Sequence, residues 1–351
     1  MQRGSSPRPI IEYVTTSDDG VNWIKIGDMP HFGRIVTSTE EKITKEGAKK
    51  SRQVNKGDLI LSNSMSYGLP YIMGIDGYIH DGWFVLKNFE NTFDKDYLCN
   101  LLISSAIQNQ YKRLAAGGVV QNISSDLVNS VSVSIPTMME QKKISSLLNL
   151  IDERIATQNK IIEDLKKLKS AISHILFSSK GAIHLSEIAN VVMGQSPSSN
   201  AYNDQGLGMP LVQGNLDISN GKTTPRLYTA EFNQTTEEGN IILTVRAPVG
   251  EVAKATKKVC LGRGVCAIIP HEENMSDFIY QYLTFYKFMW HRYEQGSTFT
   301  SINGSDVRNI FCPKVRNVSI LTLLDIKINI EERVVKQYQS QKQYMLYQMF
   351  I

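Results

Sequence analysis

The chain has 351 residues, of which 42% are hydrophobic and 21% are charged, and its Lys and Arg residues exceed its Asp and Glu residues by four. This length suits two or three domains, and a pI near 8.7 only weakly favours a polyanionic partner, because strongly basic nucleic-acid-binding domains usually lie above about 9. No apolar run approaches the roughly 18 residues of a membrane span, and no signal-peptide core follows Met1. We therefore expect a cytoplasmic protein that has no membrane partner.

The first segment, residues 1–136, is typical of a β-rich domain with a few short helices. Its Gly-punctuated loops carry polar side chains of the kinds that contact base edges: Arg or Lys for guanine, Asn or Gln for adenine, Asp or Glu for cytosine. The candidate DNA-binding residues in this segment are Arg8, Lys25, Asp28, Asn63, Ser64, Tyr67, Gln121 and Asn122. For any one of them, an ordinary turn residue is an equally good interpretation.

Residues 137–180 predict one long helix, because no Pro or Gly occurs from Met138 to Ser178. Pro136 and Thr137 supply the start signal, and Lys180 and Gly181 supply the stop signal. Apolar residues recur at alternating intervals of three and four, the seam of a coiled coil, at Leu148, Ile151, Ile155, Ile162, Leu165, Ile172 and Leu176. A second apolar row, formed by Leu147, Ile161, Leu168 and Ile175, predicts more than one packing neighbour.

The next segment, residues 181–315, predicts a second β-rich domain. Its candidate DNA-binding residues are Gln213, Asn215, Arg246, Ser297, Thr298 and Asn303. Residues 183–192 precede its Gly-Gln-Ser-Pro sequence, whereas the first domain begins almost at its Gly-Ser-Ser-Pro sequence. We therefore expect the first domain to lack an opening turn and strand, through a shortened reading frame, a misassigned start or a recombining cassette. Restoring such residues is expected to stabilise that domain.

The last segment, residues 316–351, predicts a second long helix. Its seam residues are Leu321, Leu324, Ile328, Val335, Tyr338, Met345 and Met349. A whole domain separates the two helices, so the connection leaves them free to pair in antiparallel orientation.

The two predicted helices match each other when the sequence is shifted by 173 residues. Leu148, Leu150, Asp152, Ile155, Lys169 and Phe177 coincide with the identical residues Leu321, Leu323, Asp325, Ile328, Lys342 and Phe350. Two copies of this length exclude a solenoid or propeller. The sequence therefore predicts an α+β fold with a pseudo-twofold internal repeat: two β-rich domains separated by two long helices that form an antiparallel coiled coil.

Recognisable catalytic chemistry is absent from the sequence, which contains no GxxxxGK[ST], HExxH or GxSxG motif. Cys260, Cys266 and His271 fit no common zinc-binding spacing, and we interpret the four cysteines as buried core thiols. Asp152 and Asp325 are interpreted as solvated or capping carboxylates. Two basic clusters, at 42–52 and 254–263, are equally consistent with phosphate contacts and with solvated surfaces.

These features resemble those of Type I restriction-modification specificity subunits. The resemblance rests on Gly-Ser-Ser-Pro-Arg-Pro, on Trp-Ile-Lys-Ile-Gly-Asp, on the Ile-Pro-x-x-x-x-Glu-Gln-x-x-Ile sequence from Ile135 to Ile144, and on the doubled helix. The second copy lacks the Glu-Gln pair after Cys312 and Pro313, so its partner contact is expected to differ.

The resemblance implies a target recognition domain for each half of a split double-stranded DNA site. It also implies that the coiled coil binds methyltransferase subunits, two of them by the internal symmetry, and through these the restriction subunits. S-adenosylmethionine, ATP and Mg²⁺ are then expected on the partner subunits only, with no catalytic residue, metal or cofactor on this chain. A helix of about 35 residues spans roughly 50 Å, more than one DNA turn of roughly 34 Å.

Two alternatives stay open from the sequence. One is a coiled-coil adaptor or assembly protein that does not read DNA. The other is a nuclease built from Glu163, Asp164 and Lys166, although these residues fall on consecutive turns of the predicted helix, where a solvated face is the simpler interpretation.

Overall fold

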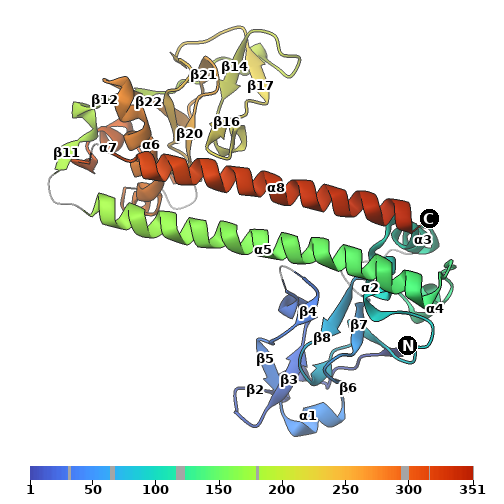
Figure 1. Ribbon diagram of the computed structural model, residues 1–351. Helices are drawn as coiled ribbons and strands as arrows, with labels where there is room; N and C mark the ends of the chain where they lie inside the picture. Colours follow the sequence, from blue (N-terminus) through green and yellow to red (C-terminus); the bar gives the residue numbers. More distant parts are fainter. Residues whose placement is uncertain are drawn as a thin grey trace. The chain divides into compact units, whose positions relative to one another are not determined.

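The computed structural model describes residues 1–30, 33–63, 68–115, 123–178, 182–293, 300–315 and 317–350. These residues form two compact units. Unit 1 consists of Met1–Ile161 with Glu331–Ile351, and unit 2 consists of Ile162–Ile330. Each unit therefore combines one β-rich domain with part of each of the two long helices, α5 (Met138–Phe177) and α8 (Ser319–Met349) (Figure 1).

Unit 1 contains two five-stranded sheets. The first has the order β1-β10-β7-β8-β4, with β1 (Gln2–Arg3), β10 (Trp83–Leu86), β7 (Leu59–Ser62), β8 (Pro70–Met73) and β4 (Ile35–Val36). The second has the order β2-β5-β3-β9-β6, with β2 (Val14–Thr15), β5 (Glu41–Ile43), β3 (Val21–Ile24), β9 (Gly77–Ile79) and β6 (Arg52–Val54). Its shorter helices are η1 (Ile10–Glu12), η2 (Ile26–Asp28), α1 (Lys45–Lys49), α2 (Lys95–Ile103), α3 (Ser105–Ala115) and α4 (Ser125–Asn129).

Strand β7 explains how the core of unit 1 is layered. Successive side chains of a strand point to opposite faces, and β7 is buried on both, so it reads as a continuous apolar run. Leu59 and Leu61 pack with α2, α3 and the long helices, whereas Ile60 packs in a separate cluster with residues of the other sheet. One face of this sheet therefore binds the helices and the other face binds the second sheet.

Unit 2 contains a six-stranded and a five-stranded sheet. The first has the order β12-β22-β19-β20-β16-β15, with β12 (Ala189–Met193), β22 (Val265–Pro270), β19 (Ile241–Thr244), β20 (Val252–Lys254), β16 (Lys222–Thr223) and β15 (Ile218–Ser219). The second has the order β13-β17-β14-β21-β18, with β13 (Tyr202–Asn203), β17 (Leu227–Thr229), β14 (Met209–Val212), β21 (Val259–Leu261) and β18 (Thr235–Thr236). The shorter helices are η3 (Leu185–Glu187), η4 (Ser199–Ala201), η5 (Asn215–Asp217), η6 (Glu273–Met275), α6 (Ser276–Tyr286), η7 (Lys287–Arg292) and α7 (Gly304–Arg308).

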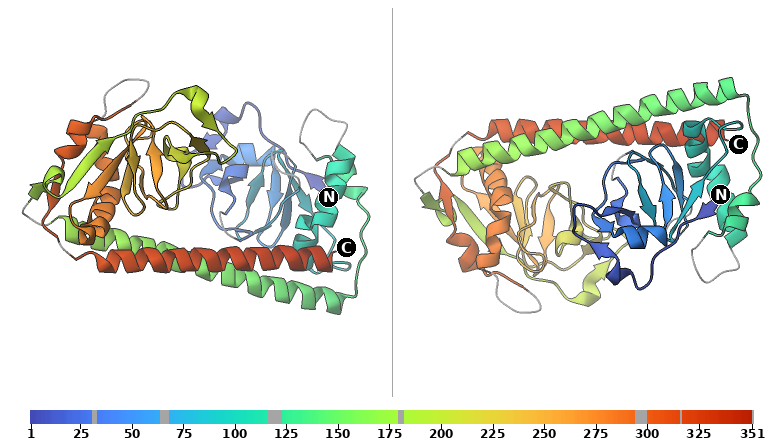
Figure 2. Two further views of the ribbon diagram at one scale, coloured as in Figure 1. Left: turned by 90° about the horizontal axis from the view of Figure 1, so that it is seen from above. Right: turned by 90° about the horizontal axis from the view of Figure 1, so that it is seen from below.

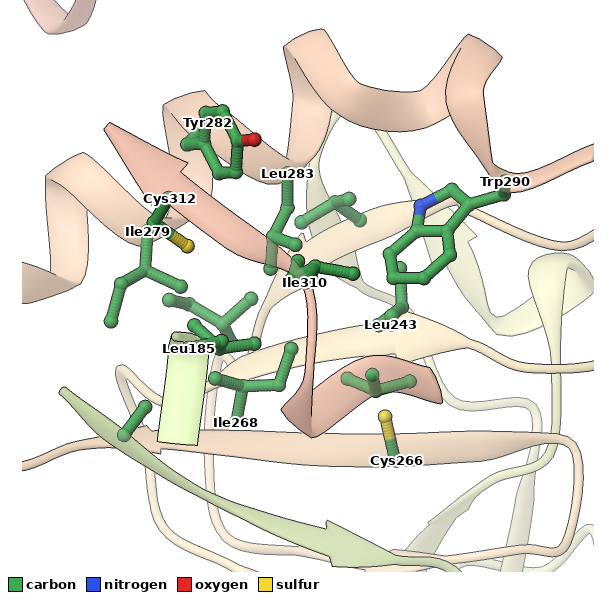
Figure 3. Packing of buried hydrophobic residues seen from close by; sticks show 14 of the residues in the cluster. Leu185, Leu243, Cys266, Ile268, Ile279, Tyr282, Leu283, Trp290, Ile310 and Cys312 are labelled. Carbon is green, nitrogen blue, oxygen red and sulfur yellow. The ribbon is translucent and has the colours of Figure 1, made fainter. Parts of the chain in front are cut away.

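The core of unit 2 repeats the layering of unit 1. In β19, Ile241 and Leu243 pack with the helices, and Ile242 packs toward the second sheet. Figure 3 shows Leu243 and Ile268 of the sheet beneath Ile279 and Leu283 of α6, with Trp290 beside Leu243. The described cysteines are all free and buried, which confirms their interpretation as core thiols.

The two units share one strand topology, and this confirms the predicted internal repeat. The order β1-β10-β7-β8-β4 matches β12-β22-β19-β20-β16, and β2-β5-β3-β9-β6 matches β13-β17-β14-β21-β18. The parallel pairs also correspond, because β3 with β9 matches β14 with β21, and β4 with β8 matches β16 with β20. Figure 2 shows both β-rich domains from two further sides.

The units differ at their opening strands. In unit 2, β11 (Ala182–His184) pairs with β23 (Phe311–Pro313), and Leu185, which follows β11, is fully buried. In the described part of unit 1, the counterpart of β23, residues 131–136, forms no strand, and β1 has two residues where β12 has five. That an added opening segment would stabilise the first domain stays a prediction.

Both long helices of the prediction are confirmed, and they pair in antiparallel orientation within each unit. In unit 1, Asp152 of α5 contacts Lys342 of α8, and Gln158 contacts Glu331. In unit 2, Lys169 of α5 contacts Asp325 of α8. Every predicted seam residue is buried or half-buried. Among the described helices, none combines the length and the apolarity needed to cross a bilayer.

Candidate nucleic-acid interface

In unit 1 three segments surround an open cavity of about 920 Å³. These are the Pro-rich segment at Ser6–Ile10, the end of β3 with η2, and the turn at His80 and Asp81. Ser6 Oγ donates to Asp81 Oδ1 over 2.7 Å and accepts from the Asp81 backbone N–H. The hydrogen bond from Ser6 is the main cause that lowers the pKa of Asp81, so this carboxylate is charged at neutral pH.

The predicted residues Arg8 and Lys25 line this cavity. The Arg8 side chain is 81% exposed and its Nη2 lies 3.4 Å from Asp81 Oδ2, a loose surface pair that leaves the guanidinium free to turn outward. Lys25 Nζ lies 2.6 Å from Glu41 Oε1, and this hydrogen bond raises the pKa of Lys25. Two basic side chains therefore lie beside the Pro-rich segment, whose residues from Arg8 to Ile10 are exposed.

Two other predicted residues of unit 1 shape loops. Asp28 Oδ2 accepts from the backbone N–H of Lys25 and Oδ1 accepts from that of Glu40, which fixes the turn at η2. Asn63 is 3% exposed, and its Nδ2 donates to the carbonyl of Asp81 over 2.8 Å. A side chain this buried cannot reach a base edge, so Asn63 is corrected from a base-reading candidate to a loop-shaping residue. Ser64, Tyr67, Gln121 and Asn122 lie outside the described residues.

Unit 2 repeats the first loop framework with different side chains. Ser196 Oγ accepts from the backbone N–H of Arg263 over 3.0 Å, as Ser6 does from Asp81. The strand register pairs Val212 with Leu261 and Ile24 with Ile79, which makes Gln213 the counterpart of Lys25. A cation in one unit is thus replaced by an amide in the other.

Sequence similarity alone points to the wrong counterpart of Asp28. Gly27-Asp28 resembles Gly214-Asn215, but Asp217 Oδ2 accepts from the Gln213 backbone N–H, as Asp28 does from Lys25. Asp217 is 3% exposed and is paired with Arg226 at 3.1 Å, whereas Asn215 is exposed. The loop of unit 2 holds one more residue between Gln213 and Asp217 than unit 1 holds between Lys25 and Asp28, and the shared hydrogen bond reveals the match.

A second group of loops in unit 2 brings Arg246 beside residues 300–303. Arg246 forms a β-bridge with Ser301, and the backbone N–H of Ile302 donates to the carbonyl of Val245. Arg246 itself is exposed. Asn303 Oδ1 instead accepts from the backbone N–H groups of Ser305 and Asp306, so Asn303 caps α7. Ser297 and Thr298 lie outside the described residues.

Some members of the basic clusters contact carboxylates or an aromatic ring of the same chain. Lys45 pairs with Asp19 at 3.8 Å, and Lys258 pairs with Glu237 at 2.5 Å. Lys257 lies 5.5 Å from the ring centroid of Tyr228. These contacts favour surfaces of mixed charge, and phosphate binding by the clusters stays a prediction.

Asp152 and Asp325 of the long helices do not act as the solvated or capping carboxylates that the sequence suggested. Asp152 Oδ1 accepts from Lys342 and Asp325 Oδ1 accepts from Lys169, each over 2.5 Å, and both carboxylate side chains are 30% exposed. The earlier interpretation is wrong, because each carboxylate meets a lysine from the other helix.

The residues of the nuclease alternative lie on a solvated helix face. Lys167 bridges Glu163 and Asp164, whose side chains are 65% and 63% exposed. Within the described residues, no three His, Cys, Asp or Glu side chains are grouped to hold a metal ion.

Comparison with known proteins points to one family. A family model described as the Type I restriction modification DNA specificity domain matches residues 8–167 and again 181–337. A Methanocaldococcus jannaschii chain named as a type I restriction enzyme MjaX specificity subunit is 29% identical over 334 residues, covering 87% of this chain and 76% of the relative.

Two solved structures share the fold. One comes from work on complex assembly and conformational transition of the type I R-M system, and it matches with a TM-score of 0.64 at 20% identity. The match covers 99% of this chain and 93% of the chain in that structure. The type I restriction-modification system S subunit from M. genitalium has a TM-score of 0.59 at 17% identity, covering 97% and 94%.

Proposed function

Because this chain belongs to the Type I restriction modification DNA specificity domain family and carries the domain twice, we propose that it is the non-catalytic specificity subunit of a Type I restriction-modification complex. Each β-rich domain reads one half of a bipartite double-stranded DNA target. One observation carries this proposal. The two units have the same strand topology, and each unit includes part of both long helices.

The loop frameworks support different half-sites for the two domains. In both frameworks a serine side chain accepts the same backbone N–H hydrogen bond, yet Lys25 is replaced by Gln213 and Asp81 by Arg263. Lys favours guanine and Gln favours adenine in the major groove. We assign base contacts to Arg8, Lys25, Gln213, Asn215 and Arg246, whose side chains are exposed or half-buried at the loop surfaces.

Repeated apolar patches on the helices support two methyltransferase subunits as partners. Leu147 and Leu150 in unit 1 are 40% and 59% exposed, and their counterparts Ile320 and Leu323 in unit 2 are 46% and 60% exposed. Matched apolar pairs on two units suit two copies of one partner. Restriction subunits then join through the methyltransferases, and S-adenosylmethionine, ATP and Mg²⁺ act on those partners. The complex acts on DNA in the cytoplasm of a bacterium or archaeon.

The experiment is co-expression with the neighbouring methyltransferase chain, followed by mapping of methylated bases in the host genome. The expected result is one bipartite motif that appears only when both chains are present. An adaptor without DNA readout would leave methylation independent of this chain or absent, and either outcome overturns the proposal.

Partner binding is tested with Leu150→Asp and Leu323→Asp. Each variant is expected to reduce bound methyltransferase to one copy, and the double variant to none, as measured by mass photometry. Leu168→Asp is the matched control, because Leu168 is 49% exposed but its counterpart in the repeat is Gln341. Equal loss in the control would contradict the assignment.

A further inference from the structure

A partly buried polar contact joins the recognition domain of unit 2 to both long helices. Asp325 of α8 accepts from Lys169 of α5 over 2.5 Å and from Gln281 of α6 over 2.7 Å. Gln281 is only 3% exposed, and its Oε1 is buried without a hydrogen-bond partner among the described residues. A single carboxylate therefore holds three helices at one point.

Unit 1 contains the same contact with the helices exchanged. Asp152 of α5 accepts from Lys342 of α8 over 2.5 Å, and these residues are the repeat counterparts of Asp325 and Lys169. In unit 1 the domain helix α2 carries Asn100 at the position that corresponds to Gln281 of α6. The Asn100 side chain is one methylene shorter than that of Gln281. Arg34 fills the gap, since its Nη2 lies 3.0 Å both from Asn100 Oδ1 and from Asp152 Oδ2.

A second repeated contact lies one turn away on each domain helix. Asn149 Nδ2 donates to Asp96 Oδ2 over 2.9 Å in unit 1, and Thr322 Oγ1 donates to Asp277 Oδ2 over 3.2 Å in unit 2. Asn149 and Thr322 are again related by the repeat. Two polar contacts per unit thus define where each domain helix lies along the helix pair.

Stability alone does not account for these groups. Taking charged groups even partly out of water is costly, and well-packed apolar residues often stabilise as much or more. Burial is the main cause that lowers the pKa of Lys342, against the opposing effect of Asp152, and Arg34 Nη1 is buried without a described partner. An apolar helix face accepts several registers, one turn or about 5.4 Å apart, whereas a half-buried carboxylate accepts only the register that supplies its hydrogen-bond donors.

We propose that Asp152 and Asp325 are positioning residues that fix each DNA-reading domain in one register on the helix pair, and thereby restrict the complex to one spacer length between the half-sites. This inference rests on the proposed function. Arg34 serves as an adaptor that lets the shorter Asn100 reach the same carboxylate as its counterpart Gln281 does directly.

The test uses the complex with its methyltransferase partner and maps the methylated motif of each variant. Asp152→Asn and Asp325→Asn are expected to raise methylation at sites whose spacer differs by one base pair by about tenfold, because a charge-assisted hydrogen bond contributes about that factor or more. The bases of each half-site stay unchanged. Asp164→Asn is the matched control on the exposed face of α5 and is expected to keep the original spacer.

Rescue separates positioning from folding. Arg34→Ala is expected to relax the spacer like Asp152→Asn, and Arg34→Ala with Asn100→Gln is expected to restore it by recreating the direct contact of Gln281. Melting temperatures identify any variant that fails to fold. In that case the comparison of Arg34→Ala with the double variant decides whether the contact positions the domain. If the unmodified complex methylates no bipartite motif, the proposed function itself falls. The positioning role is overturned if the unmodified complex methylates a bipartite motif and every variant keeps its one spacer length. It is also overturned if the double variant still methylates sites with altered spacer lengths.

Discussion

The helix-docking side and the loop side of each recognition domain follow the internal repeat to different degrees. On the docking side, Tyr97 packs on Phe350 at 5.2 Å between ring centroids, and its counterpart Phe278 packs on Phe177 at 6.3 Å. On the loop side, the hydrogen bonds that Ser6 and Asp28 accept from backbone N–H groups recur at Ser196 and Asp217, whereas Lys25 and Asp81 are replaced by Gln213 and Arg263. This difference teaches that the scaffold is constrained by geometry shared between both copies, whereas the readers are free to diverge.

The aromatic anchors should give the largest effect. Phe177→Ala and Phe350→Ala are each expected to lower the free energy of unfolding by about 3–5 kcal/mol, the usual range for a buried aromatic side chain. Phe177 should be the more costly to remove, since its ring also lies near Tyr282 at 5.4 Å and Phe285 at 5.3 Å. Urea unfolding gives the magnitude, and hydrogen exchange shows which unit loosens. Equal loosening of both units by either variant would contradict independent docking.

A smaller, one-sided effect is expected from Gln141, which has no counterpart amide in the second copy. Gln141 is 1% exposed; its Oε1 accepts from Asp94 N, and its Nε2 donates to the carbonyls of Thr92 and Pro136. Gln141→Ala should destabilise unit 1 by about 2 kcal/mol, because three partly buried backbone groups lose the hydrogen-bond partner that the buried amide supplies.

The control for Gln141 is the residue before it. Glu140 forms an exposed capping box with Thr137, so Glu140→Ala should destabilise unit 1 much less than Gln141→Ala. If the two variants had equal effects on unfolding in urea, the structural role of Gln141 would be refuted.

The smallest effect should appear on the loop side, as a change in pH dependence. Burial lowers the pKa of His80 below 6.5, and the nearby carboxylate of Asp81 opposes this shift. Between the folded-state pKa and 6.5, the unfolded state binds more protons, so the free energy of unfolding falls as the pH falls through that window.

His80→Gln should therefore flatten the decline in stability below pH 6.5 while keeping an acceptor for the backbone N–H of Gly82. Denaturation midpoints at several pH values check this. A variant that declines as steeply as the unmodified protein would show that His80 does not carry the effect.

The sequence predicted the fold class well, because heptad spacing and the repeat are local or additive signals. It misread Asp152, since the partner Lys342 lies 190 residues further along the chain. Asn63 looked like an ordinary loop residue, and only the folded turn at Asp81 shows that it is buried. A polar residue's role depends on which distant group it meets, and hydrophobic periodicity carries no information about that partner.

The correspondence between loop residues of the two units likewise could not be read from the sequence. Gly27-Asp28 resembles Gly214-Asn215, yet the loop of unit 2 is one residue longer, and Asp217 is the residue that keeps the hydrogen bond to the preceding strand end. Ser64, Tyr67, Gln121, Asn122, Ser297 and Thr298 remain predictions from sequence alone.

The central claim, one recognition domain for each half-site, is tested most directly by a chimera in which residues 1–136 are replaced by a second copy of residues 182–313 ahead of Thr137. Pro136 and Pro313 end the two domains at equivalent points, and the docking contacts of α6 are made to repeat-related helix positions. Methylated-base mapping of the chimera in complex with its methyltransferase is predicted to yield an inverted repeat of one half-site, because two identical readers on an antiparallel helix pair are related by a twofold axis. An unchanged asymmetric motif would contradict the account.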